Sequence, residues 1–224
     1  MINIAIDGPA GAGKSTVAKG AAKKLGYIYV DTGALYRTIA LACTRENIDL
    51  TDEESVKSVV SIISVRLGFE NGTQKVYLSD EDVSEKIRTP EISMAASLVS
   101  KIPYVRNYLL DLQRNIAENN NILMDGRDIA TVVLPNADVK IFLFASAECR
   151  ANRRYKELVE KGEKVDYNDV LEDIEKRDYQ DSHRDIAPLK PAEDSVMFDT
   201  SNLGLEESVD KLIEIVEEKL NERV

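Results

Sequence analysis

A glycine-rich loop near the N-terminus constrains the fold more than any other feature. Residues 8–15 read Gly-Pro-Ala-Gly-Ala-Gly-Lys-Ser and follow the short apolar run 2–6. A helix-compatible stretch starts at Thr16, so the loop stands between a predicted strand and a predicted helix, as the P-loop signature requires. Its glycines let successive backbone N–H groups converge on phosphate oxygens. The sequence therefore predicts a triphosphate site made of Gly8, Pro9, Ala10, Gly11, Ala12, Gly13, Lys14, Ser15 and Thr16.

Two side chains of this loop have expected chemical roles. Lys14 can reach the β- and γ-phosphates, and the Ser15 hydroxyl can coordinate Mg²⁺. A second Mg²⁺ partner, acting directly or through water, is expected at the end of another buried strand, and Asp125 follows the apolar run 121–124. Asp-Gly is also a common turn pair. Two carboxylates and an arginine within residues 125–128 favour a functional site over a simple turn.

The composition narrows the class of protein. The 224 residues carry a net charge of −11, which argues against a nucleic-acid-binding surface. Cys43 and Cys149 stand far apart, so neither a disulfide framework nor a zinc site is indicated. No signal peptide and no apolar run of membrane-spanning length is seen. We expect one cytoplasmic, monomeric α/β domain with small-molecule ligands and without a nucleic-acid or membrane partner.

Strand and helix patterns alternate along the chain, which predicts a parallel sheet with helices on both faces. Within this pattern, residues 65–69 and 76–78 alternate in polarity around Asn71-Gly72, a type I′ turn signal. This predicts an antiparallel hairpin insert at 63–88. Five parallel strands are expected, at 2–6, 27–30, 121–124, 139–144 and 195–199.

An acidic chain that binds anions needs local groups of basic residues. Arg37 follows the second predicted strand, at the sheet edge where ligands bind, although an ordinary solvated arginine is an equal alternative. Arg106 could face the ligand cleft. The densest basic region, 147–186, is predicted to be two helices, and acidic residues alternate with its basic ones, as on a solvated face. There we assign function only to Arg153, Arg177 and Arg184, and we expect a surface role for His183.

The surroundings of the loop favour one subclass of P-loop protein. The chain lacks the Asn-Lys-x-Asp motif that reads guanine and the Leu-Ser-Gly-Gly-Gln-like signature of transporter ATPases. Several separate arginines that could converge on a second anion favour a small-molecule kinase. Two alternatives stay open, namely a kinase for another nucleotide or metabolite (UMP, dTMP or shikimate type) and a nucleotide-dependent switch without phosphoryl transfer.

The chain resembles the bacterial cytidylate kinase family over essentially its whole length. The matching motifs are residues 6–15, 31–37, 125–128 with 131–133, and 177–189. The resemblance implies the nucleoside monophosphate kinase fold and transfer of the γ-phosphoryl group of ATP, with Mg²⁺, to CMP or dCMP. It also implies a core (1–62, 89–146 and 187–224), a monophosphate-binding insert (63–88) and a mobile lid (147–186).

The resemblance further implies roles for individual residues. The CMP phosphate would be held by Arg37, Arg127 and Arg184, the sugar by Arg177 and Asp181, and the cytosine by Ser97, Arg106 and Asp128. Thr32 stands where some members of the family have Ser. The implied acceptor site comprises Thr32, Tyr36, Arg37, Ser97, Arg106, Asp125, Arg127, Asp128, Arg177, Asp181 and Arg184, and the groups expected to act on the transferred phosphoryl group are Lys14, Arg127, Arg153, Arg177 and Arg184.

Overall fold

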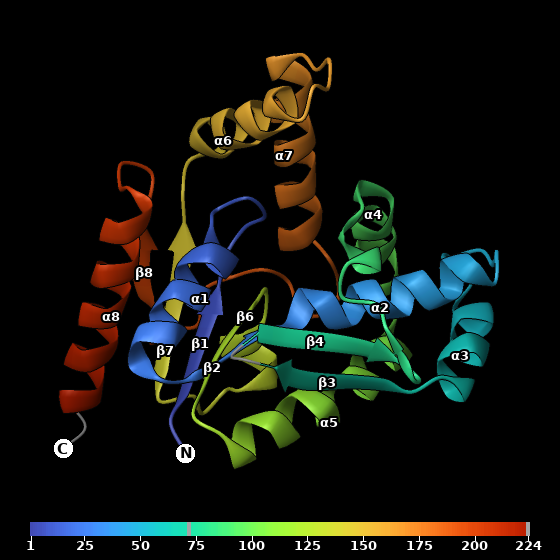
Figure 1. Cartoon of the computed structure of the whole chain (residues 1–224), viewed down its shortest axis with the longest axis horizontal. Helices are drawn as coiled ribbons and strands as arrows, with labels where there is room; N and C mark the ends of the chain where they lie inside the picture. The colour runs from blue at the N-terminus through green and yellow to red at the C-terminus, as the bar shows by residue number, and fades with distance from the viewer. Residues whose placement is uncertain (71–72, 223–224) are drawn as a thin grey trace. The chain divides into compact units, whose positions relative to one another are not determined.

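The computed structural model describes residues 1–70 and 73–222, which divide into two units (Figure 1). Unit 1 comprises Met1 and Ile28–Asn121, and unit 2 comprises Ile2–Tyr27 and Ile122–Val224. The predicted P-loop and the predicted lid both fall in unit 2. The predicted hairpin insert falls in unit 1.

Unit 2 is built on four parallel strands in the order β6-β1-β7-β8. Their bounds are Ile122–Gly126 for β6, Asn3–Asp7 for β1, Val139–Phe144 for β7 and Val196–Asp199 for β8. Strands β1 and β6 are mostly apolar and almost wholly buried, as expected for strands covered on both faces. Because Asp7 pairs with Gly126 in the ladder, the loops that follow β1 and β6 leave the sheet at the same edge.

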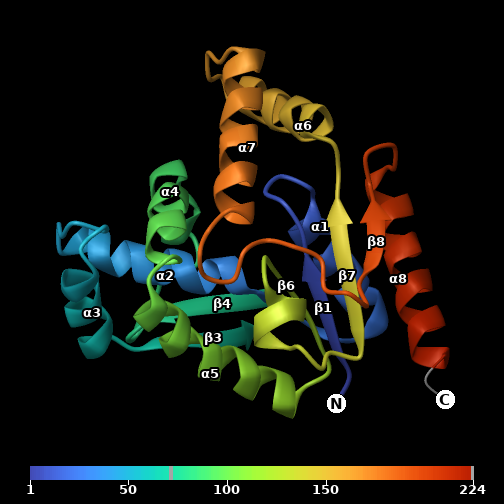
Figure 2. The same ribbon diagram turned by 180° about the vertical axis from the view of Figure 1, so that it is seen from behind.

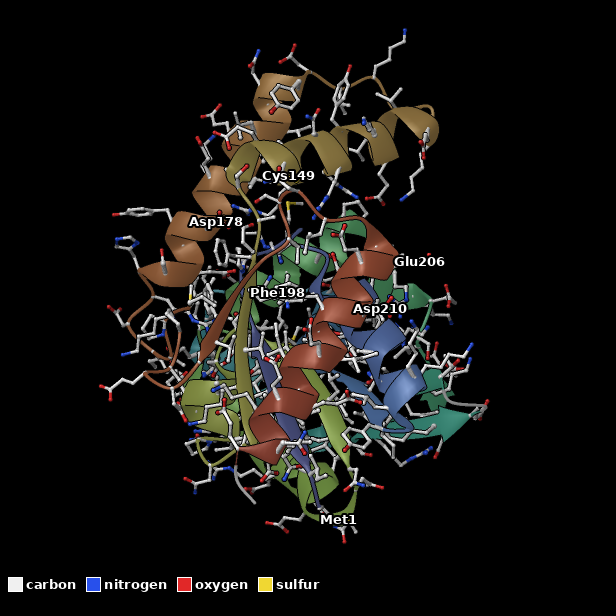
Figure 3. The ribbon with its side chains drawn as sticks, turned by 90° about the vertical axis from the view of Figure 1, so that its left-hand side faces the viewer. Met1, Cys149, Asp178, Phe198, Glu206 and Asp210 are labelled. Carbon is white, nitrogen blue, oxygen red and sulfur yellow. The ribbon has the colours of Figure 1, made fainter. Side chains whose placement is uncertain are left out.

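Helices α1 (Lys14–Leu25) and α8 (Leu205–Asn221) pack against each other in this unit. Figure 3 shows α8 in front of the sheet, with Phe198 labelled on β8 and Asp210 on the helix. A Cβ on Gly20 would lie 2.8 Å from the Val209 Cγ2 atom, so the absence of a side chain at Gly20 permits the close approach. Lys24 of α1 pairs with Asp210 at the exposed rim of this contact.

Helices α6 (Ala147–Glu160) and α7 (Tyr167–Ser182) follow β7 and lie against each other (Figures 1 and 2). Each helix begins with a capping side chain, Ser146 for α6 and Asp166 for α7. Their shared core is small, with Ala151, Leu158 and Val170 buried between the two helices.

Unit 1 begins with β2 (Ile28–Asp31) and α2 (Thr32–Arg45), and a small sheet in the order β3-β4-β5 follows α3 (Glu53–Ile62). The antiparallel pair is confirmed, with β3 at Val65–Glu70 and β4 at Thr73–Leu78, whereas the predicted Asn71-Gly72 turn lies outside the described residues. The remaining elements are β5 (Glu81–Asp82), a 3₁₀ turn (Lys86–Arg88), α4 (Pro90–Val99) and α5 (Pro103–Asn119).

The predicted fold class is confirmed. All five strands expected for the main sheet form (β1, β2, β6, β7 and β8), helices flank them, and the small antiparallel sheet is present. Besides β5 and the 3₁₀ turn, the sequence did not predict a wide turn at Ile129–Val133. In this turn the Leu134 N–H donates to the Ile129 carbonyl oxygen, five residues earlier. Such π-type turns are rare and often occur at functional sites.

Candidate active site

The backbone of the P-loop has positive φ angles, which favour glycine, at three positions. Gly8, Gly11 and Gly13 have φ angles of 151°, 73° and 83°. Gly13 also stands at the N-cap of α1, where no side chain accepts a hydrogen bond from the first turn of the helix. Gly11 and Ser15 are exposed. The loop therefore presents backbone N–H groups and the positive end of a helix to a ligand, as a phosphate group requires.

Lys14 lies in this loop. Its side chain is buried, and Nζ donates to the Pro9 carbonyl oxygen at 2.7 Å. Burial, followed by the neighbouring Arg127 guanidinium, lowers the pKa of Lys14 from 10.5 to about 7. Burial therefore disfavours the charged form of the Lys14 amine, and the negative charge of a bound polyphosphate would favour it.

Ser15 and Asp125 form the pair expected to hold a magnesium ion. The Ser15 hydroxyl donates to Asp125 Oδ2 at 2.7 Å, and Asp125 is buried at the end of β6. Within residues 1–70 and 73–222 no group of three or more acidic, His or Cys side chains could hold a metal by itself. Mg²⁺ in a phosphate site takes one or two protein oxygens and completes its shell with water and substrate phosphates, and Ser15 and Asp125 supply two such oxygens.

The loop after β6 is joined by two charge pairs to the end of α7 and to the segment that directly follows this helix. Arg127 Nε donates to Asp181 Oδ2 at 2.9 Å. Asp128 lies 3.7 Å from Arg184 Nη2, and both side chains are buried. The structure therefore brings together four predicted site residues from two segments that lie about fifty residues apart in the chain. Arg177 lies one turn before Asp181 on the same helix.

Asp7 is a buried carboxylate that the sequence did not single out. Its two oxygens accept hydrogen bonds from the backbone N–H groups of Ile129 and Ala130, both at 2.8 Å. Burial raises the pKa of Asp7 from 3.8 to about 6, although the two backbone hydrogen bonds lower it. Asp7 thus ties the base of the P-loop to the wide turn that follows Asp128. The signal was a charged residue at the end of an apolar strand.

Replacing Asp7 with Asn should change how stability depends on pH. Because the pKa of Asp7 is higher in the folded protein than in the unfolded chain, wild type gains stability from this group as pH falls through 6 towards 3.8. Relative to Asp7→Asn, wild type should gain about 2 kcal/mol in the free energy of unfolding between pH 7.5 and pH 4.5. Urea unfolding of both proteins at the two pH values measures this. If the difference in the free energy of unfolding between the two proteins is the same at both pH values, the pKa of Asp7 is not raised to about 6.

Arg150 is a second residue that the sequence analysis passed over. It is buried, and it donates to the carbonyl oxygens of Ala145 and Ala10 and to both carboxylate oxygens of Asp178 (α7, labelled in Figure 3). It thereby joins α6, α7 and the P-loop. The basic pattern of 147–186 did not distinguish it from Arg154, which pairs with Glu157 at the surface.

Arg153 was predicted to act on the transferred phosphoryl group. It is exposed, donates to the Thr200 carbonyl oxygen at 2.8 Å, and has its Nη1 atom 3.8 Å from where a Cβ on Gly13 would stand. Its guanidinium is thus carried beside the P-loop. His183 is exposed and stacks on Tyr179, in agreement with a surface role.

The other predicted site residues lie in unit 1. Asp31 caps α2, and its Oδ2 accepts from Arg37 at 2.8 Å. The Arg37 Nε atom is buried and has no hydrogen-bond partner among the described residues. The Arg106 guanidinium lies 5.8 Å from the centre of the Tyr36 ring. Two further predicted residues are the buried Thr32, at the start of α2, and the half-buried Ser97, on α4.

The P-loop, its buried lysine and the Ser15–Asp125 pair, with arginines placed beside them, define a P-loop phosphotransferase. The model of the cytidylate kinase family matches residues 4–218, and the chain belongs to this family.

Sequence relatives agree with this assignment. A cytidylate kinase of Caldicellulosiruptor saccharolyticus is 49% identical, with 96% of this chain and 95% of the relative covered. A cytidylate kinase of Bacillus subtilis is 50% identical, with 97% of each chain covered.

Among solved structures, TT1252 from Thermus thermophilus has a TM-score of 0.47 and 21% identity, with 98% of this chain and 97% of that chain covered. None of the described helices is both long and apolar enough to span a membrane.

Proposed function

We propose that this chain transfers the γ-phosphoryl group of ATP to CMP or dCMP, giving CDP or dCDP and ADP. The observation that supports the proposal is that Lys14 is held in the P-loop and Ser15 bonds to Asp125, in a chain that matches the cytidylate kinase family over residues 4–218. ATP is the phosphoryl donor and Mg²⁺ the cofactor.

The donor side follows from the geometry of unit 2. Residues 8–16 would bind the ATP phosphates, mainly through the backbone N–H groups that all of them except Pro9 carry. Lys14 would turn from the Pro9 carbonyl to the β- and γ-phosphates. Ser15 and Asp125 would hold Mg²⁺, which neutralises charge on the phosphates when it is bound. Arg153, on the helix beside Gly13, would reach the transferred group.

On the acceptor side, we propose that the phosphate of CMP is bound by Arg37, Arg127 and Arg184. The Nε atom of Arg37 supports this, because it is buried without a hydrogen-bond partner among the residues that the structure describes, and such a donor is costly unless a ligand uses it. Arg177 and Asp181 would hold the sugar, and Thr32 and Tyr36 would complete the site.

The base is assigned to Ser97, Arg106 and Asp128. Cytosine offers an N4 donor beside N3 and O2 acceptors, so a carboxylate can accept from N4 while Arg and Ser donate to the other edge. The buried carboxylate of Asp128 suits this role. Uracil carries an acceptor at position 4, so the Asp128 carboxylate would face it without a hydrogen bond to the base.

The reaction needs no covalent intermediate. The CMP phosphate is already an anionic nucleophile, so the protein has to align it with the γ-phosphorus and neutralise charge around both groups.

We propose that α6 and α7, within the lid at 147–186, close over the nucleotides and exclude water, which guards against hydrolysis of ATP. The insert at 63–88 would serve the monophosphate, and the rest of the chain would be the core. We further propose a monomer that acts in the cytoplasm.

A coupled assay of ADP release tests the function. With Mg²⁺ and ATP fixed, CMP, dCMP, UMP and AMP are compared as acceptors by their kcat/KM values. CMP and dCMP should exceed the other two. A preference for UMP or AMP would point to another nucleotide kinase. Slow turnover with all four acceptors, together with a large change of shape on binding ATP, would point to a nucleotide-dependent switch.

Replacing Asp128 with Asn should reduce the preference for CMP over UMP. The amide can no longer act as a pure acceptor for N4, and leaving buried polar groups unpaired costs about 1–3 kcal/mol each. We expect the ratio of kcat/KM for CMP over UMP to fall about tenfold or more. The exposed Asp111→Asn on α5 is the matched control and should keep the wild-type ratio. An unchanged ratio for Asp128→Asn would remove this residue from base recognition.

A further inference from the structure

The side chain of Gln74 on β4 makes hydrogen bonds to both the N–H and the carbonyl group of the Asp31 backbone. Its Oε1 atom accepts from the Asp31 N–H at 2.8 Å, and its Nε2 atom donates to the Asp31 carbonyl oxygen at 3.3 Å. Asp31 is both the last residue of β2 and the N-cap of α2. One amide side chain of the hairpin therefore fixes the residue at which strand passes into helix.

Asp31 in turn fixes the Arg37 side chain. One Asp31 oxygen accepts from the Ala34 N–H at 3.0 Å, and the other accepts from Arg37 Nη2 at 2.8 Å. There is little room around this pair, because a Cβ on Gly33 would stand 3.1 Å from both Asp31 Oδ1 and Arg37 Nη1. A shift of the Asp31 backbone would therefore move the Arg37 guanidinium.

The sequence pattern of β4 marks Gln74 as unusual. Residues 74, 76 and 78 lie on one face of the strand, and Val76 and Leu78 are buried in the core of unit 1. An apolar residue would be expected at 74 on the same face. The register is fixed by the pairing of Val65 with Leu78 and of Phe69 with Gln74, so the amide is held where the backbone of β2 needs it.

We propose that Gln74 is a positioning residue for the acceptor site, and that it aims Arg37 by holding Asp31. The hairpin insert would then contribute to binding a nucleoside monophosphate without Gln74 touching it. This inference rests on the proposed function, in which Arg37 binds the acceptor phosphate. The inference assigns a role to the β3–β4 hairpin, because Gln74 of this hairpin contacts the β2–α2 junction.

The test measures KM for CMP and for ATP separately, with the other substrate saturating. Gln74→Met keeps the length of the side chain and removes both hydrogen bonds. We expect KM for CMP to rise about five- to tenfold, while kcat and KM for ATP stay within about twofold. Gln74→Glu, which keeps only the acceptor for the Asp31 N–H, should also raise KM for CMP. Lys75→Ala, on the opposite face of the strand and paired with the exposed Asp82, is the control and should change neither KM value.

A double-mutant cycle separates positioning from a general loss of structure. If Gln74 acts through Arg37, Gln74→Met should have no further effect on KM for CMP in an Arg37→Ala background. An unchanged KM in both Gln74 variants, equal effects on CMP and ATP, or a full effect without Arg37 would each overturn the inference. If Arg37→Ala itself leaves KM for CMP unchanged, the assignment of Arg37 to the acceptor phosphate fails and the inference fails with it.

Discussion

Lys14→Ala should abolish turnover while the protein stays folded and still binds CMP. The Lys14 ammonium group donates to the Pro9 carbonyl oxygen within the P-loop. From there it would reach the β- and γ-phosphates, between which the bond breaks. Removing one preorganised group that stabilises charge in the transition state lowers kcat by about 10³-fold. The acceptor residues lie outside the P-loop, so calorimetry should find CMP affinity close to that of wild type.

Stability gives an independent check on this variant. Burial holds the pKa of Lys14 at about 7, well below its ordinary value, so at neutral pH the lysine costs the folded state free energy. Lys14→Ala should therefore unfold at a denaturant concentration no lower than wild type. Lys19→Ala, an exposed lysine on the same helix, is the control and should keep full activity. Loss of CMP affinity in Lys14→Ala would show that the two nucleotide sites are not separate.

Gly8→Ala should disrupt the P-loop itself. An added Cβ would overlap the carbonyl oxygen of Leu143 on β7 and lie 2.9 Å from the carbonyl carbon of that residue. The φ of Gly8 is 151°, which L side chains rarely adopt. Strain and overlap with backbone atoms together should lower the free energy of unfolding by at least about 3 kcal/mol. ATP binding should be lost, because the loop cannot keep its N–H groups in place.

Gly26→Ala separates the effect of backbone conformation from that of crowding. Gly26 ends α1 with a φ of 71°, but apart from its chain neighbours and its own helix no described residue has an atom within 4 Å of its added Cβ. This control should lose only about 1 kcal/mol and keep its affinity for ATP. Urea unfolding and nucleotide titration of both variants make the comparison. A Gly8→Ala protein as stable as Gly26→Ala would contradict the close approach of the loop to β7.

The P-loop could be predicted because its signal is local. The backbone of residues 8–15 is specified by glycines at positions that need positive φ, and the flanking strand and helix are adjacent in the chain. The same holds for Asp125, which ends an apolar strand. Because parallel strands deliver their carboxyl ends to one edge, its pairing with Ser15 could be expected as well.

The roles of Asp7, Arg150 and Gln74 could not be predicted, because these roles depend on burial and on partners that lie far away in the sequence. Asp7 bonds to residues more than 120 positions away, and Arg150 reaches the P-loop across 140 residues. In the sequence these residues look like an ordinary strand end, one arginine among many, and a polar residue in a hairpin. Local sequence patterns do not predict the wide turn at Ile129–Val133 either, since the N–H groups of Ile129 and Ala130 donate to Asp7 rather than to a neighbour in sequence.

The central claim is that ATP and CMP bind in separate sites with their phosphates end to end. A molecule in which adenosine and cytidine are joined at their 5′ positions by five phosphates tests this directly, by calorimetry with the full chain. One molecule should bind per chain with a Kd at least about 100-fold lower than that of ATP, because the two halves bind as linked ligands. It should also displace both ATP and CMP. A Kd no lower than that of ATP, or CMP binding that persists beside the joined molecule, would contradict the claim.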